Sequence, residues 1–250
     1  MDIDIKDSIA KGRQFLKPDW QKWRMLKTDQ SQGVPVPQMQ KPFNVDSKLI
    51  DLLPIDQITC GKVSVVDIIR QRRTRRKFNK ESISLEELSY LLWATQGVIE
   101  KYENRSLRTV PSAGARHCFE TYLYINRVAG LEQGLYRYLP FDNKLSRISL
   151  EEGLGEKLHQ AMLGNDYNCA VVFMWTAIPY RIEWRYSIVS HKFIAIDAGH
   201  ICQNLYLACE SIGCGCCAVG AYAQNEMDDF LQIDGEEEFT VYAASVGRYD

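Results

Sequence analysis

The feature that most constrains the fold is one long apolar repeat, which runs from His191 to Ile212. Its apolar residues recur at intervals of three and four positions, which is the spacing of one buried face of a helix. They are Ile194, Ala198, Ile201, Leu205 and Ala208. Gly213 follows at the position where helices often end in the left-handed conformation. The pattern therefore predicts a helix over this range, and a helix of this kind needs an apolar partner.

The partner is predicted to be a sheet. Ala170–Ala177 is apolar on both faces, which is typical of a buried strand. Further strands are expected at Phe119–Asn126, Leu135–Tyr138, Leu145–Ile148 and Thr240–Val246, and further helices at Asp4–Leu16, Val65–Arg72, Ser84–Thr95, Leu150–Leu163 and Asn225–Leu231. Helices and strands alternate without a regular βαβ rhythm. The sequence thus predicts an α+β fold in which a central helix packs on a sheet.

The N-terminal quarter differs from the rest of the chain. Lys17–Lys62 is expected to be an irregular arm, because GVPVPQMQKPF contains three prolines that interrupt helices and ladders. An arm of this length must lie on its own domain or on a partner subunit. We therefore divide the chain into residues 1–62, a helix and an extended arm, and residues 63–250, a globular domain.

Composition argues against several classes of protein. The net charge is −2 and the pI about 6.1, whereas nucleic-acid-binding proteins are usually basic. The N-terminus lacks the apolar stretch of a signal peptide, and the longest apolar run, Cys169–Ile178, is half of the roughly 20 residues a membrane helix needs. We expect a cytoplasmic protein that binds neither membranes nor nucleic acid. In that compartment its eight cysteines are expected to be thiols.

Three of these cysteines lie in SIGCGCCAVGAY, residues 211–222. A structural zinc site needs about four ligands, and no second cysteine pair or HExxH motif accompanies this stretch, so we predict no metal site. A phosphate-binding loop needs a strand before it and a helix after it, whereas here a helix comes first. The remaining interpretation is a tight turn with buried thiols, whose glycines let a flat ligand approach the backbone.

Two other stretches could bind an anion or a ligand. RQRRTRRKF, residues 70–78, carries five arginines and one lysine. It is either a solvated basic helix end or an anion clamp, because guanidinium groups donate paired hydrogen bonds to phosphate oxygens. RTVPSAGARH, residues 108–117, has Pro111 to fix the backbone, Ser112 to cap a helix and Gly114 to keep the surface low. By itself it is an ordinary loop before a helix.

Taken in order, the three stretches resemble the nitroreductase-like family of FMN-dependent oxidoreductases. GLYRY (134–138) and DAGHICQNL (197–205) add to the likeness, which covers roughly Val63–Arg248. These two are most similar to the branch that includes the thiazoline/oxazoline dehydrogenases of peptide maturation. The resemblance implies an α+β fold with a central antiparallel or mixed sheet flanked by helices. It also implies an intertwined homodimer with two FMN sites at its interface.

The resemblance also assigns candidate FMN-binding residues. They are Arg72, Arg73, Thr74 and Arg76 at the phosphate and ring edge, Pro111, Ser112, Ala113 and Gly114 along the flavin of the partner subunit, Val219 and Gly220 beside the reactive part of the ring, Asn165 at the ring, and Arg248 at the phosphate. Two positions depart from the family pattern. Val219 stands where many relatives have a glutamate. Arg185-Tyr186 stands where the peptide-oxidising branch has a Lys-Tyr pair, and an arginine cannot act as a base.

The implied activity is ping-pong hydride transfer from NADH or NADPH, through FMN, to a small organic acceptor. Two alternatives stay open. One is an azoline-type dehydrogenase that acts on a peptide or a heterocycle, and the other is a flavin- or nucleic-acid-binding module without turnover. No residue stands out as the catalytic proton donor, because Tyr186 and Tyr222 are as well explained by packing.

Overall fold

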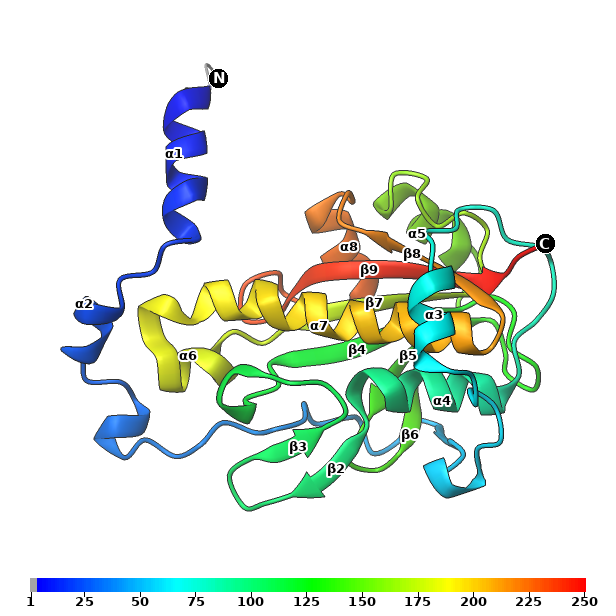
Figure 1. The fold of residues 1–250 in the computed structure, drawn as a ribbon, viewed down its shortest axis with the longest axis horizontal. Coiled ribbons are helices and arrows are strands. Elements are labelled where there is room, and N and C mark those ends of the chain that lie inside the picture. The colour runs from blue at the N-terminus through cyan, green and yellow to red at the C-terminus, as the bar shows by residue number, and fades with distance from the viewer. Residues whose placement is uncertain (1–3) are drawn as a thin grey trace.

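The computed structural model describes residues 4–250, and its centre is a seven-stranded antiparallel sheet (Figure 1). The strand order is β1-β6-β5-β4-β7-β9-β8. The bounds are β1 Leu49–Asp51, β4 Phe119–Ile125, β5 Gly134–Leu139, β6 Lys144–Ser149, β7 Val171–Ala177, β8 Cys214–Val219 and β9 Phe239–Arg248. A separate hairpin is formed by β2 (Val98–Lys101) and β3 (Ser106–Arg108).

Helices cover both faces of the sheet. The α-helices of the described residues are α1 Ile5–Phe15, α2 Trp20–Arg24, α3 Val65–Gln71, α4 Leu85–Gln96, α5 Leu154–Ala161, α6 Tyr180–Tyr186, α7 Ser190–Ser211 and α8 Gln224–Leu231. The apolar residues of α4 and α7 share one core with the sheet, and those of α5 and α8 share a second core on the opposite face. Strand β7 serves both, because Phe173 faces the first core and Met174 the second.

The predicted α+β architecture is confirmed, and α7 is its longest helix among the described residues (Figure 1). All five apolar positions of its predicted stripe are buried. Gly213 follows the helix with a φ of +68°, the left-handed conformation expected of it. The predicted capping box of α4 is also present, because Ser84 and Glu87 exchange both hydrogen bonds. The helix predicted from Leu150 begins later, at Leu154, because Gly153 is left-handed.

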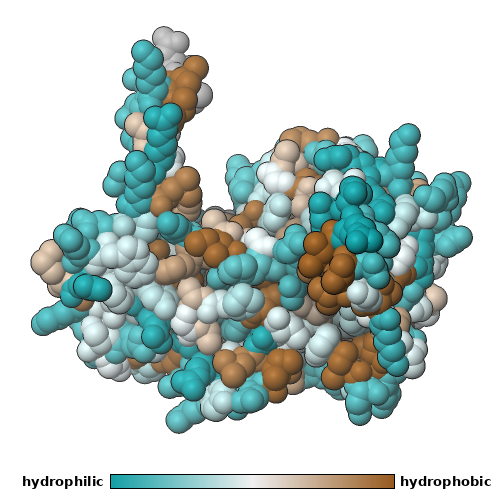
Figure 2. Space-filling model, viewed as in Figure 1, coloured by the Kyte–Doolittle hydropathy of each residue, from teal (hydrophilic) through white to brown (hydrophobic). Residues whose placement is uncertain are grey.

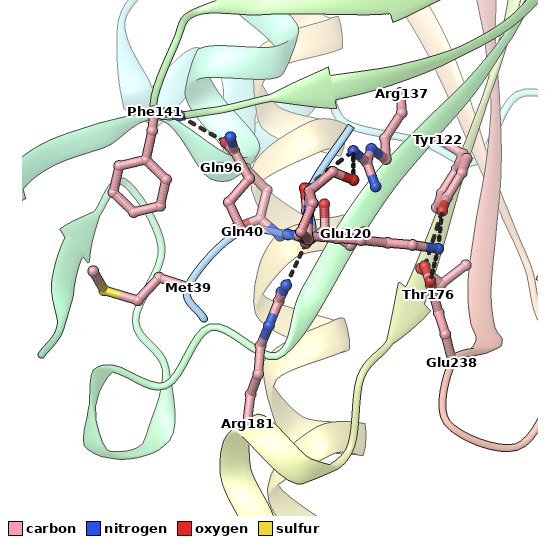
Figure 3. A network of polar contacts seen from close by, with 12 residues as sticks. Met39, Gln40, Gln96, Glu120, Tyr122, Arg137, Phe141, Thr176, Arg181 and Glu238 are labelled. Atoms are coloured by element: carbon pink, nitrogen blue, oxygen red, sulfur yellow. Dashed lines mark hydrogen bonds and ion pairs between the residues drawn. The ribbon is translucent and has the colours of Figure 1, made fainter. Parts of the chain in front are cut away.

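The arm at 17–62 is less irregular than its prolines predict. It contains α2 and also β1, whose residues Leu49–Asp51 pair with β6 at the edge of the main sheet. The arm lies on its own domain here, and a buried polar network fastens it (Figure 3). The Lys41 amide donates to Glu120 Oε1 at 2.8 Å, and Arg137 Nη2 donates to the carbonyl of Pro42 at 2.8 Å.

The network is anchored by two buried carboxylates. Glu120 also accepts a hydrogen bond from Arg181 Nη2 at 2.6 Å, and both side chains are almost completely buried. Glu238 pairs with the Lys41 ammonium and accepts from the Thr176 hydroxyl at 2.6 Å. These buried charges would be costly without their partners, so the contacts of the arm and the sheet support each other.

Two apolar surfaces are left exposed by the described residues. Helix α1 stands away from the domain and buries none of its side chains (Figure 1). On α3, Val65, Val66 and Ile69 are each more than 60% exposed, and they form part of a brown patch in Figure 2. Among the helices of residues 4–250, none is both long and apolar enough to cross a membrane.

Candidate functional site

The cysteine-rich stretch forms β8, so the expectation of a tight turn was wrong. Cys214–Val219 pairs along its whole length with β9, which fixes it as an extended edge strand. All eight cysteines are free thiols, as predicted. Burial raises the pKa of Cys214 to about 12, which makes it an inert packing residue. Within residues 4–250, no three His, Cys, Asp or Glu side chains gather as a metal site would require.

The arginine segment lies against the free edge of β8. Thr74 forms a parallel bridge with Cys216, and the amide of Arg75 donates to the Cys216 carbonyl at 3.1 Å. Residues far apart in sequence are thereby brought side by side. The segment also fits closely, because a Cβ on Gly215 would lie 2.9 Å from Cβ of Arg75.

The side chains of this segment divide into two groups. Arg75 is structural: its guanidinium makes a two-pronged ion pair with Glu210 at 2.6 and 3.1 Å and lies 3.8 Å from the centre of the Tyr249 ring. Arg73 donates only to backbone carbonyls, and its side chain is exposed, as is that of Arg76. Arg72 is half-buried, and it makes no hydrogen bond with its guanidinium in the described chain.

Tyr206 of α7 joins the arginine segment to β8. Its hydroxyl accepts a hydrogen bond from the Ala218 amide at 2.8 Å and lies 3.2 Å from the Thr74 hydroxyl. The Arg72 guanidinium sits over its ring, 5.4 Å from the centre. Sequence reasoning missed this residue, although it follows directly after the DAGHICQNL stretch that carries the family likeness.

The end of β8 offers accessible backbone. Val219 is buried and packs in the second core, whereas Gly220 is exposed. A Cβ placed on Gly220 would meet nothing nearer than Tyr242 Cε2, at 3.9 Å. The residue after Gly220 is held by Asn165, whose side-chain amide donates to the Ala221 carbonyl at 3.1 Å. Asn165 therefore lies close to Gly220, and its amide group is engaged with the protein.

Arg248 is engaged in the same way. Its guanidinium pairs with Glu87 and donates to the carbonyl of Ile212, so it closes the C-terminal end of α7. These contacts connect α4, α7 and β9. A role of Arg248 at a phosphate stays a prediction, and it would need the guanidinium to keep or exchange these partners.

The candidate loop Pro111–Gly114 forms a turn that lies against the N-terminal half of α7. The Ala113 amide donates to Asp197 Oδ1 at 3.4 Å, and the Ser112 hydroxyl accepts from the His117 amide at 2.9 Å. Gly114 has a φ of +60°, and a Cβ there would lie 2.8 Å from the Tyr186 hydroxyl. Tyr186, which the sequence offered as a donor or a packing residue, is thus packed against the turn.

The turn and the arginine segment are separated within one chain. Asp197 and Tyr206, which contact them, are nine residues apart on α7, since 206 − 197 = 9. At 1.5 Å per residue this is a separation of about 14 Å along the helix. The structure therefore brings together the candidates at 72–76, 165 and 219–220, and it places the candidates at 111–114 elsewhere.

Comparison with known proteins gives one matching family, described as the Nitroreductase family, over residues 69–248. The curated protein "Putative nitroreductase MJ1384" of Methanocaldococcus jannaschii is 32% identical over 200 residues, which span 79% of this chain and 98% of that protein. The trifolitoxin-processing protein TfxB of Rhizobium leguminosarum is 26% identical over 149 residues, 57% of this chain and 40% of TfxB.

Three solved structures share the fold. A Ralstonia eutropha protein, also named a "putative nitroreductase", has a TM-score of 0.67 and 23% identity, and covers 86% of this chain and 97% of its own. A chain of the Escherichia coli microcin synthetase McbBCD complex with truncated pro-MccB17 has a TM-score of 0.60 and 16% identity, and the match covers 80% of this chain and 84% of that chain. The Vibrio harveyi NADPH:FMN oxidoreductase, complexed with NAD+, has a TM-score of 0.53 and 16% identity, and the match covers 74% of this chain and 69% of that chain.

Proposed function

The chain belongs to the nitroreductase family, as its ordered motifs predict, and from this we propose that it is an FMN-dependent NAD(P)H oxidoreductase. The observation that carries the proposal is the contact between the arginine segment and the edge of β8, next to the open backbone at Gly220. A phosphate site and a surface for a flat ring would thereby lie side by side.

The residues present fit FMN. Arg72, Arg73 and Arg76 are not paired with a carboxylate among the described residues, so an added dianion would relieve the repulsion between them. The edge-facing groups of β8 alternate with a period of two: the carbonyl of Cys216 and the amide of Ala218 both point to the arginine side. The same alternation would direct the amide of Gly220 toward a ring that lies on this edge.

Bound FMN would supply the hydride-transfer chemistry that links NADH or NADPH to a small organic acceptor. The chain's part is to bind and orient. The guanidinium groups of Arg72 and Arg76 would hold the phosphate, and fixed backbone dipoles at Gly220 would stabilise negative charge on the ring. The turn at Pro111–Gly114 would line the flavin of a partner subunit.

A homodimer is part of the proposal. The outer face of α7 exposes small and apolar residues, Ala195, Ile196 and Gly199, which suit close packing of a second helix. If two copies pair α7 antiparallel about a two-fold axis, the turn of one copy approaches the arginine segment of the other. That arrangement would close the 14 Å separation seen in the single chain.

A second candidate is an azoline-type dehydrogenase that acts on a peptide or a heterocycle. The similarity to the trifolitoxin-processing protein TfxB favours it. Arg185 weighs against it, because a guanidinium does not release its proton at ordinary pH. NAD(P)H oxidation by a small acceptor is therefore the first proposal, and peptide oxidation the second.

The spectrum of the purified protein separates these functions. We expect a yellow protein with a band near ~450 nm that bleaches when NADH or NADPH is added anaerobically. Bleaching by a peptide but not by a nicotinamide would favour the second candidate. A colourless protein that takes up no added FMN and binds DNA in a salt-sensitive manner would contradict both. In the Arg72→Ala variant, unchanged flavin content would count against the proposed phosphate site.

A further inference from the structure

Asp197 is a carboxylate in an unusual place. It lies in the middle of α7 and is 3% exposed, and its Oδ2 atom has no hydrogen-bond partner in the described chain. Burial raises its pKa, and hydrogen bonds from Ser112 and Ala113 oppose that shift. A buried carboxylate without a paired cation destabilises a fold, whereas an apolar residue at this position of the stripe would not. Packing alone does not explain why an acid stands here.

The turn that contacts Asp197, residues 112–117, has a strained backbone. Gly114, Ala115 and His117 have φ angles of +60°, +53° and +44°, so three of four consecutive residues are left-handed. For Ala115 and His117, which carry side chains, this conformation is unfavourable and persists only when surrounding contacts impose it. Backbone strain of this kind gathers at functional sites.

Asp197 makes contacts that hold this left-handed backbone in place. Its Oδ1 accepts from the Ala113 amide at 3.4 Å, and the Ser112 side chain is close enough to the same carboxylate to lower its pKa. The Ser112 oxygen accepts from the His117 amide at 2.9 Å, which leaves its proton available to the carboxylate. The carboxylate thus holds Ala113 directly, and Ser112 links it to His117 at the end of the turn.

We infer that Asp197 is a positioning residue: it holds the strained turn 112–117 in the conformation that lines the flavin. The inference rests on the proposed function, because that function places FMN against this turn. It adds a residue that touches the turn from α7 and would not touch the cofactor. It also assigns a purpose to the aspartate of the DAGHICQNL stretch.

The test compares Asp197→Ala with Asp197→Asn. Asparagine keeps an oxygen that accepts from Ala113 and Ser112, whereas alanine removes it. We expect FMN affinity to fall about tenfold in the alanine variant, the factor for one or two lost hydrogen bonds, and to stay within about threefold in the asparagine variant. The visible circular dichroism of bound FMN should change in the alanine variant only. Asp228→Asn is the control, because Asp228 is equally buried and hydrogen-bonded, but on the opposite face of the sheet.

A second measurement needs no cofactor. In the flavin-free protein, hydrogen–deuterium exchange of a peptide covering residues 111–117 should be about tenfold faster in Asp197→Ala than in wild type or Asp197→Asn. Unchanged exchange would overturn the inference, and so would an asparagine variant as defective as the alanine variant. If wild type binds no FMN, the proposed function fails, and with it the link from this turn to the flavin. Faster exchange with unchanged FMN binding would show that the turn is anchored by Asp197 but is not part of the cofactor site.

Discussion

Replacing Tyr206 by phenylalanine removes one hydroxyl from the junction between the arginine segment and β8. The ring stays, and with it the stacking of Arg72 at 5.4 Å. The amide of Ala218 loses its acceptor at 2.8 Å, which costs about 1–1.5 kcal/mol for a partly buried donor. The Thr74 hydroxyl is exposed and can turn to water, so its 3.2 Å contact adds little. This loss of unfolding free energy lowers the melting temperature by about 2–6 °C in a chain of this size.

The assay is thermal unfolding of the flavin-free protein together with an FMN titration. We expect Tyr206→Phe to unfold at a lower temperature than wild type. We also expect it to bind FMN up to about tenfold more weakly, because the arginine segment and β8 are no longer joined by the Tyr206 hydroxyl. Tyr249→Phe is the matched control, since its hydroxyl makes only a 3.4 Å contact with Glu210 and its ring would still carry Arg75. Equal melting temperatures for Tyr206→Phe and wild type would refute the role of the hydroxyl. A lower melting temperature with unchanged FMN affinity would separate the junction from the cofactor site.

Three further predictions follow from buried groups. Glu120→Gln leaves Arg181 buried without its counter-charge, so urea unfolding should show a loss of about 3 kcal/mol. Burial lowers the pKa of His117 to about 3, so its contribution to stability is complete above pH ~6.5 and is lost as the pH falls toward 3, by at most about 1.4 kcal/mol per pH unit. In His117→Gln, the urea concentration at half-unfolding should therefore change less between pH 7 and pH 4.5 than it does in wild type. Gly114→Ala should destabilise by about 1–2 kcal/mol, because φ is +60° and the new methyl group meets the Tyr186 hydroxyl, and a melting temperature equal to wild type would contradict this.

The sequence predicts those parts of the fold whose signals are local. The apolar stripe and Gly213 define α7, and the Ser84–Glu87 pair defines the start of α4. Strand β8 was missed because a run of glycine and cysteine has no alternation, and only its pairing with β9 makes it extended. Likewise β1 depends on β6, which lies about a hundred positions further along the chain. Such long-range pairings leave no mark in a short window of sequence.

The residues of the candidate site likewise fall into those that the sequence predicts and those that depend on long-range contacts. The family likeness located the arginine segment and the turn, but it gave no distances. Partners far along the chain, such as Glu87 for Arg248, decide which side chains stay free to meet a ligand. Asp197 and Tyr206 were beyond prediction for a further reason. Each acts on backbone amides of another segment, so its role exists only once those segments have been placed by the fold.

The long helix α7 therefore does more than fill the core. Its buried stripe fixes the sheet, while two of its polar residues hold two separate surface segments about 14 Å apart, a distance that a rigid helix keeps constant. A flavin gripped by the arginine segment of one copy could reach the turn of the other only if the two helices meet at one register. If two copies bind FMN between them, as proposed, the ligand stabilises their association by mass action, and FMN binding and dimerisation are linked.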